Sequence, residues 1–118
     1  MKRGEIWTVA GGPDYTSKPR PAVILQADQF GNLDSVTICL FTSEGARTPL
    51  MRIPVYPSRE NGLLLPSWLM VDKIATVPRA KLGICIGSLD HDTLIELGRA
   101  VTRGLSRAAK ERTPTRTS

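Results

Sequence analysis

The chain has 118 residues, of which 41% are hydrophobic and 23% charged, and its 16 Lys and Arg against 11 Asp and Glu give a formal net charge of +5. This length fits one compact domain, and the composition excludes an intrinsically disordered chain. No apolar run is long enough to span a membrane, and the charged start lacks the apolar stretch of a signal peptide. We therefore expect a cytoplasmic protein without a membrane span.

The positive charge is unevenly spread along the chain. Ten basic and seven acidic residues leave +3 over residues 1–89, residues 90–109 are neutral, and residues 110–118 carry +2. A positive excess favours a polyanionic partner such as nucleic acid, but the folded part of this chain is only mildly basic. We therefore expect any such binding to depend on a few well-placed cations.

Short apolar and β-branched segments, separated by turn residues, fill the chain as far as residue 88. They predict strands over residues 5–9, 22–26, 35–42, 51–56, 68–78 and 83–88. Pro54 marks its segment as an edge strand, since proline cannot donate to a sheet ladder. Because closing such strands into a cylinder removes exposed edges, we expect a mainly β fold, a small SH3-like barrel.

One helix is predicted to follow the strands. Asp90 suits its N-cap, and Asp92 lies in the first turn, where the helix dipole favours a carboxylate. Its apolar face would consist of Leu94, Leu97, Val101, Leu105 and Ala108. We expect a single domain over residues 1–109, made of the barrel and this C-terminal helix, and a flexible basic tail over residues 110–118.

The residues that most often bind metals are few in this chain. Cys39 and Cys85 both lie in strand-like apolar segments, so we expect two reduced thiols in the core rather than a disulfide. His91, the single histidine, lies between two aspartates, but adjacent residues on a helix point apart, so we expect a surface side chain. The sequence has no Cys or His residues at the spacing of a zinc site, no phosphate-binding glycine loop and no nucleophile elbow. We therefore expect the protein to bind neither a metal ion nor a cofactor.

Three segments carry a more specific signal. They are KRGEIWTV at 2–9, KPRPAVIL at 18–25 and LFTS at 40–43. In this order and spacing the chain resembles the MazF/PemK family of toxin endoribonucleases. The resemblance extends more loosely through Gly-Leu at 62–63 and an aspartate before Lys-Ile at 73–74, and it covers about residues 1–106.

The resemblance implies a toxin of a type II toxin–antitoxin pair, a homodimer of SH3-like barrels. Such a toxin is a sequence-selective endoribonuclease that cuts single-stranded RNA without a metal ion and so inhibits translation and growth. The ribose 2′-OH attacks the adjacent phosphate, leaving a 2′,3′-cyclic phosphate and a 5′-OH. The resemblance also implies an antitoxin whose acidic, partly disordered segment lies across the RNA groove.

Arg20 and Thr42 are the candidates for binding the reacting phosphate. The Arg20 guanidinium stays cationic and offers forked donors that match two phosphate oxygens, and the flanking Pro19 and Pro21 stiffen its segment. Thr42 ends a predicted strand, and its hydroxyl, with that of Ser43 beside it, can donate to a non-bridging oxygen.

The general base stays open among Glu5, Asp72 and a group that the sequence does not identify. Glu5 lies near the barrel mouth, but its pKa would have to rise to serve at neutral pH, and a nearby Arg20 would lower it, so Glu5 could instead orient Arg20. Asp72 matches an aspartate that acts as base in one branch of the family. That branch has an arginine where this chain has Met70, and it has a loop histidine that this chain lacks.

Further cations are candidates for contacts with flanking phosphates. They are Lys18 in the first loop, and Arg47 and Arg52 after Thr42. Such contacts contribute salt-dependent affinity rather than sequence choice.

Two alternatives remain at this level. A gyrase-inhibiting binding toxin of the CcdB type acts through an aromatic residue near the end of its last helix, whereas this chain has no aromatic residue after Trp68. A catalytically silent relative would bind RNA or an antitoxin without cutting, and Met70 and the missing histidine leave that alternative open.

Overall fold

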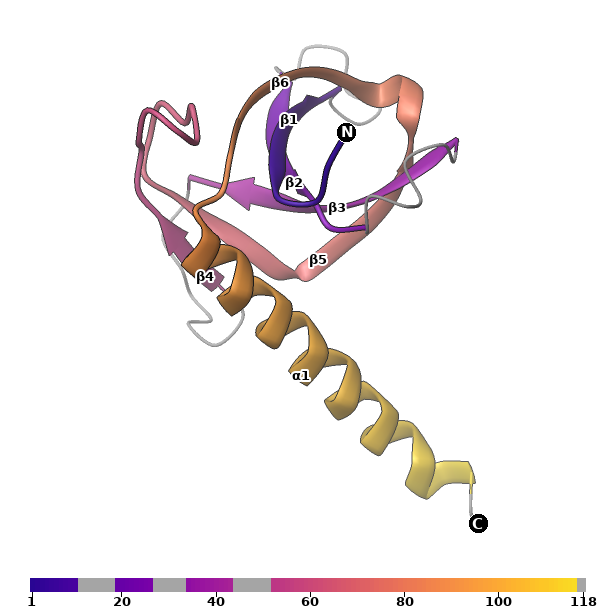
Figure 1. Cartoon of the computed structure of the whole chain (residues 1–118). Coiled ribbons are helices and arrows are strands. Elements are labelled where there is room, and N and C mark those ends of the chain that lie inside the picture. The colour runs from indigo at the N-terminus through magenta and orange to yellow at the C-terminus, as the bar shows by residue number, and fades with distance from the viewer. Residues whose placement is uncertain (11–18, 27–33, 44–51, 117–118) are drawn as a thin grey trace.

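The computed structural model describes residues 1–10, 19–26, 34–43 and 52–116, with side chains as far as residue 103. One six-stranded antiparallel sheet curls round on itself, and a long helix leaves from its end (Figure 1). The strands are β1 (Glu5–Val9), β2 (Arg20–Ile24), β3 (Ser35–Thr42), β4 (Arg52–Val55), β5 (Ser67–Pro78) and β6 (Leu82–Ser88). The helices are a short 3-10 turn, η3 (Arg79–Lys81), and α1 (His91–Arg116). The predicted mainly β class with a C-terminal helix is confirmed.

The strand bounds follow the predictions to within two residues, and β1 and β3 have the predicted bounds. β2 differs most, because it begins at Arg20 and includes Pro21. At that level β2 pairs with β1, where Pro21 faces Thr8, and the ladder with β3 begins only at Ala22. A proline is tolerated there because Pro21 has a ladder partner on the β1 side but none on the β3 side, so its missing N–H leaves no ladder bond to β3 unmade.

The sheet order is β4-β5-β3-β2-β1-β6, so β4 and β6 are its edges, and the predicted edge position of Pro54 is confirmed. The segment 56–66 brings the two edges together: the Ser88 N–H donates to the Glu60 carbonyl at 2.9 Å. A Cβ on Gly87 would come within 2.3 Å of that same carbonyl oxygen. The barrel therefore closes through close backbone packing rather than through pairing of β4 with β6.

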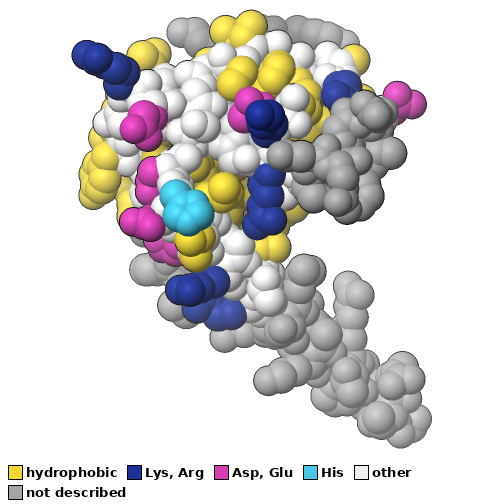
Figure 2. Space-filling model, in the orientation of Figure 1, with side chains coloured by type: hydrophobic (Ala, Val, Ile, Leu, Met, Phe, Trp, Pro, Cys, Tyr) yellow, Lys and Arg dark blue, Asp and Glu magenta, His cyan; other side chains and the backbone are white. Residues whose placement is uncertain are grey.

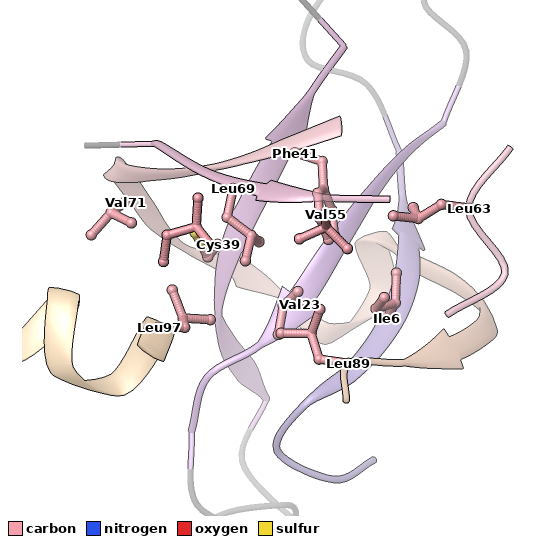
Figure 3. Close-up of a cluster of buried hydrophobic side chains, with 11 residues drawn as sticks. Ile6, Val23, Cys39, Phe41, Val55, Leu63, Leu69, Val71, Leu89 and Leu97 are labelled. Atoms are coloured by element: carbon pink, nitrogen blue, oxygen red, sulfur yellow. The ribbon is translucent and has the colours of Figure 1, made fainter. Parts of the chain in front are cut away.

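Alternating side chains fill both faces of the central strands. The main cluster lies inside the curled sheet, with Leu63 at one side and Leu97 of α1 at the other (Figure 3). A second cluster on the opposite face consists of Val9, Ala22, Ile24, Val36 and Ile38. Leu97 is fully buried, so this part of the predicted helix face is confirmed.

Helix α1 begins as predicted at the Asp90 cap. The Asp90 carboxylate accepts from the hydroxyl of Thr93 at 2.6 Å and from its N–H at 3.0 Å, and these bonds lower the pKa of Asp90. The C-terminal end differs from the expectation, because the helical backbone continues past residue 109 to Arg116. Leu105 and Ala108 lie outside the described side chains. None of the described helical segments is long and apolar enough to cross a membrane.

The two cysteines have different surroundings. Cys39 is buried as predicted, and burial, with the Asp72 charge, raises the pKa of its thiol to about 12. The prediction for Cys85 is wrong: its side chain is exposed, because β6 is an edge strand whose residues are mostly uncovered. His91 is exposed at the start of α1, as expected (Figure 2).

Candidate active site

A cavity of about 760 Å³ lies where β1 and β3 end and where β2 and β5 begin. Its polar lining includes Thr8, Arg20, Thr42, Ser43, Arg52 and Lys73. Its apolar lining includes Phe41, Leu63, Leu64, Leu65, Met70 and Ile86. Four residues singled out from the sequence, Arg20, Thr42, Ser43 and Arg52, thus meet in one cavity.

Strand register explains why Arg20 and Thr42 meet. β2 and β3 pair with Ala22 opposite Leu40, so the start of β2 at Arg20 lies near the end of β3 at Thr42, just beyond the paired residues. Arg20 is exposed, and no described carboxylate lies within ion-pair distance of it. Its guanidinium is thus placed to receive an anion.

Arg52 and Asp72 form an ion pair between β4 and β5, in which the Arg52 Nη1 donates to the Asp72 Oδ1. Arg52 faces Met70 in the ladder, and its side chain is only 17% exposed. Arg52 lines the cavity, whereas Asp72 is not among the lining residues and is linked to the cavity only through Arg52. A guanidinium therefore stands beside Asp72 although position 70 itself is a methionine.

Glu5 lies outside this cavity. It faces Ser88 at the start of β1, whereas Arg20 faces Val9 at the other end of that strand. Burial opposes its ionisation, but hydrogen bonds from the Lys2 N–H at 2.7 Å and from the Trp7 indole at 3.2 Å outweigh it, and the pKa of Glu5 falls below 4.5. The structure places Glu5 at the opposite end of β1 from Arg20.

Other site predictions have mixed outcomes. Lys18 and Arg47 lie outside the described residues. Lys73 lines the cavity but was not singled out, because one basic residue in a strand has no spacing that marks it. Within the described ranges, no group of three or more His, Cys, Asp or Glu side chains could hold a metal ion. That the protein uses no metal stays a prediction.

The polar part of the cavity suits a phosphodiester. The guanidinium of Arg20 and the ammonium of Lys73 supply positive charge, the charge of Arg52 is shared with its ion-pair partner Asp72, and the Thr42 hydroxyl can donate a hydrogen bond. Such groups stabilise the extra negative charge of a pentacoordinate phosphate more than that of the ground state. The arrangement can therefore both bind and activate a phosphate.

Comparison with known proteins gives consistent results. Residues 2–105 match the family of PemK-like, MazF-like toxins of type II toxin–antitoxin systems. A Mycolicibacterium smegmatis protein named probable endoribonuclease MazF is 42% identical over 101 residues, which are 86% of this chain and 93% of that protein.

Solved structures show the same fold. The Mycobacterium tuberculosis toxin MazF-mt6 superposes with a TM-score of 0.70 at 27% identity, over 86% of this chain and 96% of that one. A mycobacterial endoribonuclease solved with its cognate antitoxin gives a TM-score of 0.72 at 19% identity, over 90% and 95% of the two chains. With the family match over almost its whole length, this chain belongs to the PemK-like, MazF-like toxins of type II toxin–antitoxin systems.

Proposed function

We propose that this chain is a toxin that cuts single-stranded RNA without a metal ion and so halts translation and growth. The observation that carries the proposal is the cavity in which Arg20, Thr42 and Arg52 meet. The name of the 42% identical relative, probable endoribonuclease, supports it. The scissile phosphate binds at these three side chains.

The reaction is an internal transfer at phosphorus. The 2′ oxygen forms a bond to the phosphorus, the bond to the 5′ oxygen breaks, and the products are a 2′,3′-cyclic phosphate and a 5′-OH. Arg20 and Thr42 hold the non-bridging oxygens as charge builds on them. The departing 5′ oxygen takes its proton from solvent, since a guanidinium is a poor acid.

Asp72 takes the proton of the 2′-OH in this proposal. Of the two carboxylates considered from the sequence, Asp72 alone is bonded to a residue that lines the cavity. Glu5 is committed to its hydrogen bonds with Lys2 and Trp7 at the other end of β1.

The partners follow from the same proposal. The chain acts in the cytoplasm as a homodimer and is held inactive by a cognate antitoxin whose acidic segment covers the cationic cavity. A solved mycobacterial relative in complex with its antitoxin supports such a partner. A gyrase-binding role has less support, since no aromatic residue follows Trp68. A silent relative would bind RNA at the same cavity without cutting it, and a cleavage assay separates it from the proposed enzyme.

A cleavage assay in EDTA tests the proposal. Wild-type protein, purified free of antitoxin, should cut single-stranded RNA, and Arg20→Ala should slow cleavage by about 100-fold or more. Asp72→Asn should slow it by a similar factor of about 100, while RNA binding persists. Lys81→Ala, which removes an exposed cation outside the cavity, is the matched control and should cut normally.

Two results would contradict the proposal. One is wild-type protein that leaves a varied set of RNAs intact in EDTA. The other is an Arg20→Ala variant that is folded and fully active. A supercoiling assay with gyrase should show no effect of the protein, and inhibition there would favour the binding-toxin alternative.

A further inference from the structure

The apolar part of the cavity includes two leucines in unusual surroundings. Leu64 is 93% exposed and Leu65 is 61% exposed, yet both lie on the wall of a cavity that also holds the cations. Apolar groups gathered at a concave site commonly mark a binding surface. The question is which part of a ligand they would contact.

The backbone that presents these leucines is firmly braced. The buried Asn61 accepts through its Oδ1 from the N–H of Ser58 at 3.0 Å and of Leu63 at 2.9 Å, and its Nδ2 donates to the Tyr56 carbonyl at 2.8 Å. Leu63 is only 7% exposed and anchors the segment in the core. The exposed leucines therefore stand on a preorganised support, which reduces the entropy that a ligand must overcome.

We propose that Leu64 and Leu65 form an apolar shelf that receives an unpaired nucleobase next to the scissile phosphate. The inference rests on the proposed function, because it takes the phosphate to lie at Arg20 and Thr42. A nucleotide combines an anionic phosphate with a flat, largely apolar base, and this cavity combines a cationic part with an apolar part. Its volume of about 760 Å³ is also in the range of small-ligand sites.

The shelf also accounts for a preference for single strands. A base reaches a side-chain surface beside its own phosphate only when it leaves the stack, which an unpaired strand permits and a duplex resists. Leucine side chains offer contact area without hydrogen-bond donors or acceptors. The shelf therefore contributes affinity at this position, and polar groups elsewhere would choose between bases.

A binding cycle with abasic RNA tests the shelf. The cut site is first mapped with wild-type protein, and the RNA is then made uncuttable by a 2′-deoxy nucleotide at that site. Binding is measured by fluorescence anisotropy for wild type, Leu64→Ser and Leu65→Ser, with intact RNA and with RNA lacking one base on either side of the cut. The control is Ile84→Ser, which replaces an isoleucine that is 65% exposed on β6 outside the cavity.

The expected result is a loss of about tenfold in affinity for intact RNA with either serine variant. For RNA that lacks the contacted base, wild type and variants should bind equally, and Ile84→Ser should resemble wild type throughout. Circular dichroism and thermal unfolding verify that each variant is folded.

Other results would overturn the shelf. Equal loss on intact and abasic RNA would show that the leucines contact no base. Unchanged RNA binding with a change in molecular mass, or with weaker binding of a purified antitoxin, would assign the leucines to a protein interface. If the wild type cuts RNA and the serine variants bind it equally well, the shelf alone is overturned. If the wild type neither cuts nor binds RNA, the proposed function is overturned and the shelf with it.

Discussion

At the scale of single residues, Glu5 and Asp72 show how the fold gives similar carboxylates different surroundings. Asp72 pairs with Arg52 beside the cavity, and Glu5 ties the N-terminal turn to the Trp7 indole. The amino group of Met1 also lies 4.0 Å from the Glu5 carboxylate. These contacts suit a structural role for Glu5.

Glu5→Gln should therefore leave cleavage within about threefold of wild type and should lower the free energy of unfolding at neutral pH by about 1 kcal/mol. The folded-state pKa of Glu5 lies below its ordinary value of 4.5, so its ionised form stabilises the fold above that pH. The stabilisation is lost as the pH falls through the folded-state pKa. Urea unfolding of both proteins over a falling pH series should show their difference shrink toward zero in acid, and a constant difference would contradict this account.

The sequence could single out Arg20 and Thr42 because both lie in the segments that resemble the MazF/PemK family, KPRPAVIL and LFTS. It could not place Glu5, because the Trp7 contact depends on how β1 turns at its start. Nor could it pair Arg52 with Asp72, since that contact depends on the register of β4 against β5. Short sequence segments can therefore indicate single candidate residues, whereas contacts between residues on neighbouring strands depend on the strand register.

At the scale of elements, the segment 56–66 links closure of the barrel to the site. Gly62 has a φ of +68°, and a Cβ there would lie 2.1 Å from the Ile86 carbonyl oxygen. A side chain would therefore strain the backbone and push the segment away from β6. The strands themselves could be predicted from their β-branched residues. The close approach of the Gly62 backbone to β6 could not, because the only trace of it in the sequence is the Gly-Leu pair at 62–63.

Gly62→Ala should destabilise the protein by about 1–3 kcal/mol and weaken RNA cleavage as well, because the same backbone presents Leu63 to the core and Leu64 to the cavity. Gly98→Ala is the matched control. A Cβ at Gly98 would meet only the end of the flexible Arg3 side chain, at 3.2 Å, and alanine favours a helix by about 1 kcal/mol over glycine. Thermal unfolding should thus move in opposite directions for the two variants, and a neutral Gly62→Ala would show that the closure tolerates a shift.

At the scale of the whole molecule, the described residues on the face shown in Figure 2 carry charges of both signs. Figure 2 shows Lys and Arg side chains interspersed with Asp and Glu on the face that it presents. The cations of the cavity come from three separate strands, β2, β4 and β5. We therefore attribute RNA affinity to these placed cations rather than to the net charge of +5.

Removal of residues 110–118 tests this distinction, because it lowers the net charge from +5 to +3 and leaves every described cavity residue in place. The side chains of α1 that pack on the core include Leu94, Leu97 and Val101, well before the cut. Cleavage should stay within about threefold of the full chain, with a slightly weaker dependence of RNA affinity on salt. A cleavage assay and a salt titration of binding on both chains measure this, with thermal unfolding to check the fold. Loss of activity comparable to that of Arg20→Ala would show that the end of α1, helical to Arg116, takes part in RNA binding.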